Sequence, residues 1–448
     1  MNLSVSNQTR EARFAAYVDA LAGGLGHADR IAPMQAYCTG LLLPGERKSI
    51  EPMAAQLAPH RAQAAHQSLH HLVAQAEWSD EILLASVREQ VLPVIERHGA
   101  IRAWIVDDTS FPKKGIHSVG VARQYCGQLG KQDSCQVAVS LSLANDDASL
   151  PIAFQLYLPE EWAQNSERRA KAGVPETVAF HSKPIIALAQ IRAALLAGVS
   201  PAVVLADAGY GSATAFRTAL TKMGLTYIVG IPSSTSLWAP GTGPVPPQPW
   251  SGRGRPPTLL RRDAQHKPVS AQKLAKTLPE TTWQIVTWRE GSKAALTSRF
   301  AAVRVRPAHR DYWRATLRPE EWCLIEWPEG EKQPTKYWLS TLPEDLGLTE
   351  LVDLAKLRWR IERDYQELKQ EIGLGHFEGR GWRGFHHHAT LCIAAYGFLV
   401  SERSRFFPST PVRPAIRKAP QPSKAHDPGG RAHPSRTSRR PVDRHHPG

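Results

Sequence analysis

Apolar and polar positions alternate with different periods along the chain. From about residue 10 to 98, apolar residues recur at helical spacing, which predicts an α-helical domain over residues 1–98. In "SIEPMAAQLAPHRAQ", Ser49 is placed to cap a helix, and Pro59 divides two short amphipathic stretches. Two interpretations remain open for this region: a helix-turn-helix that binds the major groove of DNA, and a small bundle that only packs.

The pattern changes to strands near Ile101. The runs "AWIVDDTSF", "CQVAVSLSLAND" and "LPIAFQLYLP" are rich in β-formers and are separated by turn residues. A helix is predicted at about 183–197, followed by the apolar strand "PAVVLADAGYG", a helix opened by Ser212 and the strand "TYIVGI". This order of elements predicts a mixed α/β domain, with its first part over residues 99–231.

The α/β pattern is interrupted over residues 232–336. "APGTGPVPPQPWSGRGRPP" is loop-like, and "TWQIVTW", "FAAVRVRP" and "EWCLIEWP" predict short strands, so we expect a β-rich insertion. The domain is then predicted to resume over 337–405 with one continuous helix across Leu354–Leu374. Residues 406–448, with nine prolines after residue 407 and many basic residues, predict a disordered basic tail.

Composition narrows the class of protein. The net charge of +14 favours a polyanionic partner, but nine Lys or Arg and two Asp after residue 407 give half of it, +7. The five cysteines form no CxxC pair, so neither zinc nor a disulfide framework is predicted. The absence of a secretory pattern and of long apolar runs predicts a cytoplasmic protein without a membrane span. "GQLGK" lacks phosphate-loop spacing, so no nucleotide cofactor is expected.

Acidic residues stand at positions suited to metal chemistry. Asp107 and Asp108 follow "AWIV", and Asp207 ends "AVVLA", where strand ends of open sheets present ligands. Magnesium takes oxygen ligands, and two divalent cations roughly 4 Å apart can activate the attacking oxygen and stabilise the leaving one in phosphodiester chemistry. Each acidic residue taken alone is more commonly a cap or turn former.

The stretch "LAKLRWRIERDYQELKQEIGL" carries a sharper signal. Arg358 and Glu362 are four residues apart and Lys369 follows seven later, so the three share one helical face. Apolar residues at Leu354, Leu357, Ile361, Leu368 and Ile372 would anchor the helix. A carboxylate flanked by two cations could bind a metal while its neighbours hold phosphates; the alternative is a surface ion pair worth a few tenths of a kcal/mol.

"RWRIERDYQELK" resembles the motif of the DDE transposases of bacterial insertion sequences, of the IS-four-like branch and its IS-seven-zero-one group. The resemblance covers roughly residues 101–400. It assigns Glu362 as the catalytic Glu and Arg358 and Lys369 as its basic partners. It selects Asp108 in "VDDTSF" over Asp107, and it matches Asp207 in "LADAGYG". The branch commonly has Tyr where this chain has Ala355, so a DNA-hairpin intermediate that depends on this Tyr is not supported.

The resemblance implies a ribonuclease-H-like α/β fold in which Asp108, Asp207 and Glu362 bind two Mg²⁺ or Mn²⁺ ions. It implies double-stranded DNA partners, both terminal inverted repeats and target DNA, and DNA-backbone contacts from Arg358, Lys369, Lys113 and Lys114. A homodimer on DNA and a location at the bacterial nucleoid are expected. Two alternatives stay open: a catalytically silent DNA-binding protein or repressor, and a nuclease that only hydrolyses.

Overall fold

Helices make up the chain before the first strand. The computed structural model describes residues 9–290 and 295–406, so the predicted tail lies outside the described residues apart from Phe406. Ser49 takes the predicted N-cap position of α3, but its side chain makes no capping hydrogen bond. The Ser79 hydroxyl caps α5 by accepting the Ile82 N–H (3.3 Å). The helices are α1 Arg10–Ala22, α2 Ile31–Leu42, α3 Ile50–Leu57, α4 Ala62–His70 and α5 Asp80–Ile95. Whether they form a separate DNA-binding domain stays a prediction.

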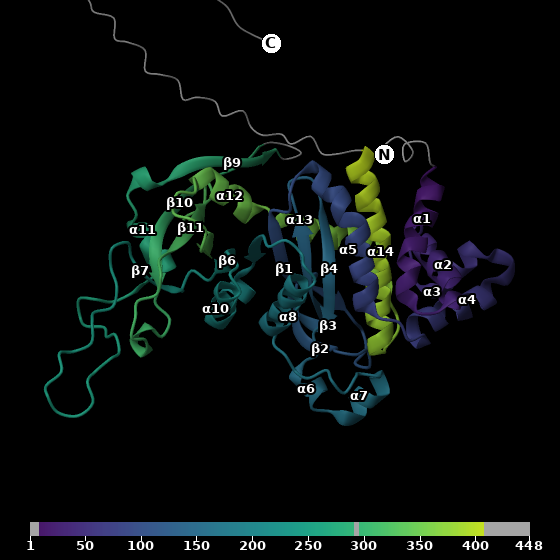
Figure 1. Cartoon of the computed structure of the whole chain (residues 1–448), viewed down its shortest axis with the longest axis horizontal. Helices are drawn as coiled ribbons and strands as arrows, with labels where there is room; N and C mark the ends of the chain where they lie inside the picture. The colour runs from purple at the N-terminus through teal and green to yellow at the C-terminus, as the bar shows by residue number, and fades with distance from the viewer. Residues whose placement is uncertain (1–8, 291–294, 407–448) are drawn as a thin grey trace, which may run out of the picture. The chain divides into compact units, whose positions relative to one another are not determined.

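The last described helix, α14 (Trp382–Phe406), joins these helices to the sheet. It lies beside α5 and also contacts α2 and β4 (Figure 1). His388 Nδ1 lies 2.7 Å from the Tyr37 hydroxyl on α2, and His386 Nε2 accepts the Leu156 N–H on β4 (3.2 Å). Most of α14 is buried, so this helix is a central part of the core.

A large mixed sheet forms the centre of the chain. Its order is β2-β3-β1-β5-β6-β12-β11-β10-β7-β8, and β4 and β9 pair with β3 and β10. β1 is parallel to β5 and β5 to β6, whereas the other pairs are antiparallel. The strands before residue 232 are β1 Ala103–Pro112, β2 Ala122–Cys126, β3 Lys131–Ala144, β4 Ser149–Leu156, β5 Val203–Ala206 and β6 Tyr227–Ile231. All the strands predicted in this part of the chain are present.

The strands of residues 232–336 extend the same sheet. β12 pairs with β6 through Leu339 and Val229, and β11 and β10 follow outward. These strands are β7 Ser236–Trp238, β8 Val269–Ser270, β9 Gln284–Glu290, β10 Ala295–Pro307, β11 Glu321–Trp327 and β12 Lys336–Ser340. The α/β part therefore resumes through a strand that pairs directly with β6.

Helices cover both faces of the sheet. Alternate residues of β1 belong to different cores: Trp104 and Val106 pack with α8 and α14, whereas Ala103 and Ile105 pack with α12 and α13. The helices after β4 are α6 Glu160–Ala163, α7 Ser166–Ala172, α8 Lys183–Leu196, α9 Ala208–Gly211, α10 Thr214–Lys222, α11 Ala271–Thr277, α12 Leu348–Lys356 and α13 Trp359–Glu367.

The prediction of one continuous helix across Leu354–Leu374 is wrong. α12 ends at Lys356, α13 begins at Trp359, and a π-helix (η8, Leu368–Ile372) follows. At the break, the N–H groups of Arg360 and Ile361 bond to the carbonyls three residues earlier. The break has a packing reason, since Leu357 stays buried in the α12–α13 core while Arg358 projects towards β1.

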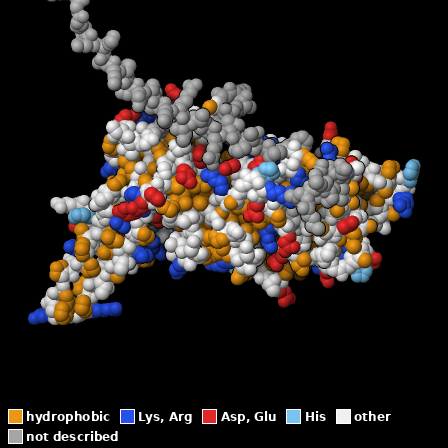
Figure 2. Space-filling model, turned by 45° about the horizontal axis from the view of Figure 1, so that its top comes forward, with side chains coloured by type: hydrophobic (Ala, Val, Ile, Leu, Met, Phe, Trp, Pro, Cys, Tyr) orange, Lys and Arg blue, Asp and Glu red, His pale blue; other side chains and the backbone are white. Residues whose placement is uncertain are grey.

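Basic and acidic side chains are interspersed on the face shown in Figure 2. On that face the positive charge of the described residues is therefore not collected in one broad patch. Within residues 9–290 and 295–406, no helix has both the length and the apolar character needed to cross a bilayer.

Asp364 on α13 offers a test of this packing. Its carboxylate is buried and accepts hydrogen bonds from the Ser149 and Tyr396 hydroxyls (2.5 and 2.9 Å), and burial raises its pKa from 3.8 to about 6. The folded protein thus keeps this proton to higher pH than the unfolded chain, so Asp364 lowers stability as pH rises from about 4 to 6. Relative to the unmodified protein, Asp364→Asn should gain about 2 kcal/mol in unfolding free energy over that interval.

Urea unfolding at pH 4 and pH 8 measures this difference. Asp345→Asn, on an exposed turn, is the matched control and should show no such gain. A stability difference for Asp364→Asn that does not vary with pH would contradict the burial argument.

Candidate active site

The two adjacent aspartates on β1 point to opposite faces of the sheet. Asp107 is on the same face of β1 as Ala103 and Ile105, the face covered by α13. Asp108 is on the other face, together with Trp104 and Val106. Asp108 Oδ2 accepts hydrogen bonds from Lys183 Nζ (3.1 Å) and from the Tyr210 hydroxyl (3.3 Å). The predicted site residue Asp108 thus lies between α8 and the turn after β5.

Asp207 ends β5 and caps the short helix α9. Its Oδ1 accepts the backbone N–H groups of Gly209 (2.9 Å) and Tyr210 (3.4 Å). β1 and β5 are parallel with Ile105 opposite Leu205, and the same register continued by two residues sets Asp207 level with Asp107. Tyr210 bonds to Asp108 from the same turn, so this turn lies next to both β1 aspartates.

The turn that holds Asp207 packs on β6 with no room for a side chain at Gly211. A Cβ added there would lie 2.0 Å from the Gly230 carbonyl oxygen, a distance that forces backbone to move. We therefore expect Gly211→Ala to lower the unfolding free energy by about 3 kcal/mol and to displace Asp207. Urea unfolding tests this, with Gly347→Ala as control because its Cβ would meet nothing within 4 Å. Equal stability of both variants would contradict the expected overlap.

Arg358 joins α13, the helix that carries Glu362 and is called the Glu helix below, to β1. Its guanidinium donates from Nη1 to Asp107 Oδ2 (2.6 Å) and from Nη2 to Glu362 Oε1 (2.6 Å). Burial alone would lower the pKa of Arg358, but the carboxylates of Asp107, Glu362 and Asp207 raise it, so the group stays charged. Arg358 therefore interacts with acidic groups from three segments that are far apart in the sequence.

The pKa of Asp107 is higher than that of an ordinary aspartate. Burial raises its pKa to about 7, with further contributions from the negative charges of Asp207 and Asp108, while Arg358 acts in the opposite direction. Its side chain is 15% exposed, against 28% for Asp108 and 60% for Glu362. Of these three carboxylates, Asp107 is thus the least accessible to a ligand from solution.

Three of the four residues predicted to contact DNA bond to the protein itself. Besides Arg358, Lys369 Nζ donates to the Ser110 carbonyl (2.6 Å) and Lys113 Nζ to the Phe377 carbonyl (2.9 Å). Burial lowers the pKa of Lys369 to about 8 and also lowers that of Lys113. Lys114 is exposed. The basic residues thus follow one line along β1.

The acidic residues suit a hard divalent cation by chemistry, because all their donor atoms are carboxylate oxygens. In the conformation described, however, no three His, Cys, Asp or Glu side chains among the described residues are grouped closely enough to hold a metal ion. The Arg358 guanidinium supplies the positive charge between Asp107 and Glu362. Arg358 would have to change partners for Glu362 to bind a metal.

Sequence reasoning did not identify every residue of this cluster. The family motif selects Asp108 over Asp107, but the pairing of Asp107 with Arg358 depends on how α13 packs against β1 and has no signal in the sequence. Lys183 and Tyr210 had no recognisable signal, because their contacts with Asp108 depend on the packing of α8 and α9 against β1.

Two comparisons with known proteins bear on this cluster. The sequence model of a family described as "DDE superfamily endonuclease" matches residues 20–295, a range that includes Asp108 and Asp207 and ends before Glu362. The chain is also 33% identical over 169 residues to a protein of Microchaete diplosiphon named "Probable transposase for insertion sequence element IS701". That match covers 38% of this chain and 41% of the relative, so it spans less than half of either protein.

Proposed function

The chain belongs to the DDE superfamily endonuclease family, and from that premise we propose that it is a transposase. It would bind the terminal inverted repeats of an insertion sequence, cleave the DNA strands there and join the freed 3′ ends to target DNA. The observation that carries the proposal is that Arg358 pairs with Asp107 and Glu362 (2.6 Å each), while the charge of Asp207 also acts on its guanidinium. Distant segments thus form one acidic cluster around a single cation, which suits phosphodiester chemistry.

The strand arrangement supports a ribonuclease-H-like catalytic fold. In the order β4-β3-β1-β5-β6, three antiparallel strands are followed by two that are parallel to β1. β2 and β4 pair with different stretches of β3 on the edge away from β1, so β2 is an addition to this five-strand pattern. Asp108 lies on β1, Asp207 directly follows the neighbouring strand β5, and Glu362 lies on α13, which packs on the face of the sheet to which Asp107 points.

In this proposal Asp108, Asp207 and Glu362 hold two Mg²⁺ or Mn²⁺ ions. The ions would activate first water and then the freed 3′-hydroxyl, and would stabilise the leaving oxygen. The family motif selects Asp108 as the β1 ligand, and its carboxylate would have to leave Lys183 and turn towards Glu362, because Asp107 is the aspartate on the α13 face. Asp107 would then fix Arg358, which keeps the Glu helix in register with β1.

The basic residues would hold the DNA backbone. Arg358 directly precedes α13, Lys369 lies on η8, and Lys113 and Lys114 follow β1, so all four could contact the DNA backbone. Phosphate contacts set the register of the duplex and carry no sequence information. Because two element ends have to be held together, a homodimer on DNA is part of the proposal, as is a location at the nucleoid.

A strand-transfer assay tests this function. Labelled DNA that carries the ends of the source element is incubated with the protein and Mg²⁺ or Mn²⁺, together with an unlabelled target. Metal-dependent nicking at the ends followed by joining of labelled 3′ ends to the target is the expected result. Nicking without joining would indicate a hydrolytic nuclease, and binding without nicking a silent DNA-binding protein. The full acidic set favours the enzyme.

A further inference from the structure

A line of basic residues continues beyond the acidic cluster. The segment from α13 to residue 381 runs beside β1 in the same direction. Arg358 contacts Asp107, Lys369 contacts Ser110, and Lys113 contacts Phe377, in that order along both segments. The Val119 N–H then donates to the Arg380 carbonyl (2.9 Å). The loop after β1 and the loop after η8 therefore stay side by side past the end of β1.

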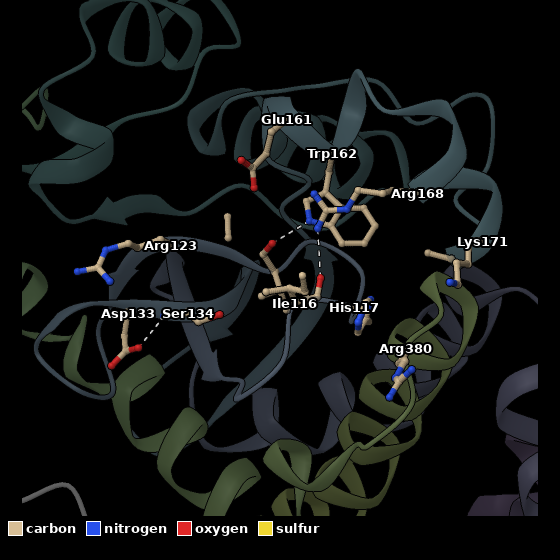
Figure 3. Close-up of a pocket in the computed structure, with 13 residues that line it drawn as sticks. Ile116, His117, Arg123, Asp133, Ser134, Glu161, Trp162, Arg168, Lys171 and Arg380 are labelled. Atoms are coloured by element: carbon tan, nitrogen blue, oxygen red, sulfur yellow. Dashed lines mark hydrogen bonds between the residues drawn. The ribbon is translucent and has the colours of Figure 1, made fainter.

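These two loops border two neighbouring pockets. The first, of about 470 Å³, is lined by Lys113 and Lys114 and by Arg47, which is paired with Glu378. The second, of about 800 Å³, lies beside α6 and α7 and is bordered by Arg123, Arg168, Lys171 and Arg380 (Figure 3). We call Lys113, Lys114, Arg123, Arg168, Lys171 and Arg380 the basic groove. Ile116 and His117 line the second pocket and connect it in sequence to Lys113 and Lys114.

Arg168 is held in a fixed position in the second pocket. Its guanidinium lies against the Trp162 ring, as Figure 3 shows. The distance to the ring centre is 3.8 Å, and Nη2 donates to the Ile116 carbonyl (3.2 Å). Trp162 is itself buried and donates its indole N–H to the Val121 carbonyl (2.8 Å). A stacked guanidinium keeps its remaining N–H groups free for an oxygen ligand and loses little entropy on binding.

The positive charge of the groove is incompletely neutralised. Lys114, Lys171 and Arg380 are exposed, and their side chains form no ion pair with any acidic group among the described residues. Two acidic residues, Asp133 and Glu161, line the second pocket. Asp133 is already paired with Lys131 (3.1 Å). Cations spaced along a groove in this way complement a polyanion with regularly spaced charges.

We propose that the basic groove binds the phosphate backbone of the DNA duplex whose end lies in the active site. This inference rests on the proposed function and adds the path of the duplex away from the cleaved bond. From Asp107 to the end of β1 at Pro112 the strand covers roughly 17 Å, about five base pairs of B-form DNA. The groove thus contacts the duplex half a helical turn or more from the scissile phosphate. These contacts are independent of sequence.

Binding of a mixed-sequence duplex of about 40 base pairs at different salt concentrations tests the groove. The test variant is Lys171→Glu/Arg380→Glu. The control is Lys222→Glu/Lys276→Glu, which changes the net charge equally at exposed positions on α10 and α11. The slope of log affinity against log salt should become shallower by about two in the test variant, with at least about tenfold weaker binding at low salt. The control should stay within about twofold of the unmodified protein.

If the unmodified protein binds and cuts DNA, equal salt slopes and affinities for the test and control variants would contradict binding of DNA by the basic groove. The proposed function would then remain intact. Failure of the unmodified protein to bind duplex DNA at all would overturn both. Melting temperatures of all variants are compared first, and the exposure of the four residues predicts unchanged values.

Discussion

Glu362→Gln is expected to reduce metal-dependent DNA cleavage by at least about 10³-fold, equivalent to about 4 kcal/mol of transition-state stabilisation. Glutamine keeps the shape of the side chain and removes the negative charge that a metal ligand needs. The side chain of Glu362 is 60% exposed, and Arg358 retains its ion pair with Asp107 when Glu362 is replaced. The variant should therefore fold normally and bind DNA. Initial rates of nicking at saturating Mg²⁺ measure the effect.

The matched control for this variant lies on the same segment. Glu371→Gln makes the same chemical change at an exposed position of η8 and should retain full activity. A chelator added to the unmodified protein should abolish nicking and leave binding unchanged. Normal cleavage by Glu362→Gln would remove Glu362 from the active site and, with it, the role assigned to α13.

Asp108→Cys is expected to be inactive with Mg²⁺ and partly active with Mn²⁺, whereas Asp107→Cys should be impaired with both metals. A thiolate is a poor ligand for the hard Mg²⁺ ion and a better one for a softer transition metal, so recovery with Mn²⁺ identifies a direct ligand. At position 107 the substitution removes the ion pair with Arg358 and displaces the Glu helix. Replacing Mg²⁺ by Mn²⁺ does not restore that ion pair. The five native cysteines are buried, which limits competing thiol ligands.

The measurement is the ratio of the cleavage rate with Mn²⁺ to the cleavage rate with Mg²⁺, for both variants and for the unmodified protein. This ratio shows which of the two adjacent aspartates binds the metal. A raised ratio for Asp107→Cys alone would make Asp107 the metal ligand in place of Asp108. Such a result would agree with the direct contact of Asp107 with Arg358, which brings it close to Glu362. An unchanged ratio for both would place neither residue at the metal.

Much of the fold could be predicted from the sequence because its strands alternate strongly and end at turn residues. The predicted run "AWIVDDTSF" is part of strand β1, the apolar run before Asp207 is strand β5, and the run after residue 183 is helix α8. The break between Lys356 and Trp359 was not predictable, because the residues around it are good helix formers. Packing of Leu357 and the pairing of Arg358 with Asp107 determine it, and both are long-range effects.

The candidate site was predictable at the level of segments. The spacing of Arg358, Glu362 and Lys369 identified the helix that lies over β1. The contacts of Asp108 with Lys183 and Tyr210, and the pairing of Lys369 with the Ser110 carbonyl, depend on how three elements pack together. Periodicity describes one element at a time and contains no information on such contacts.

The pairing of β6 with β12 also affects how the protein is made. Tyr227–Ile231 and Lys336–Ser340 are separated by more than 100 residues, yet they are neighbours in the sheet. At a synthesis rate of about 5–20 residues per second, β6 leaves the ribosome several seconds before its partner does. During that interval β6 has an unpaired edge, which another chain could pair with. Slow translation of residues 232–336 should therefore increase aggregation of the nascent protein without any change in its amino-acid sequence.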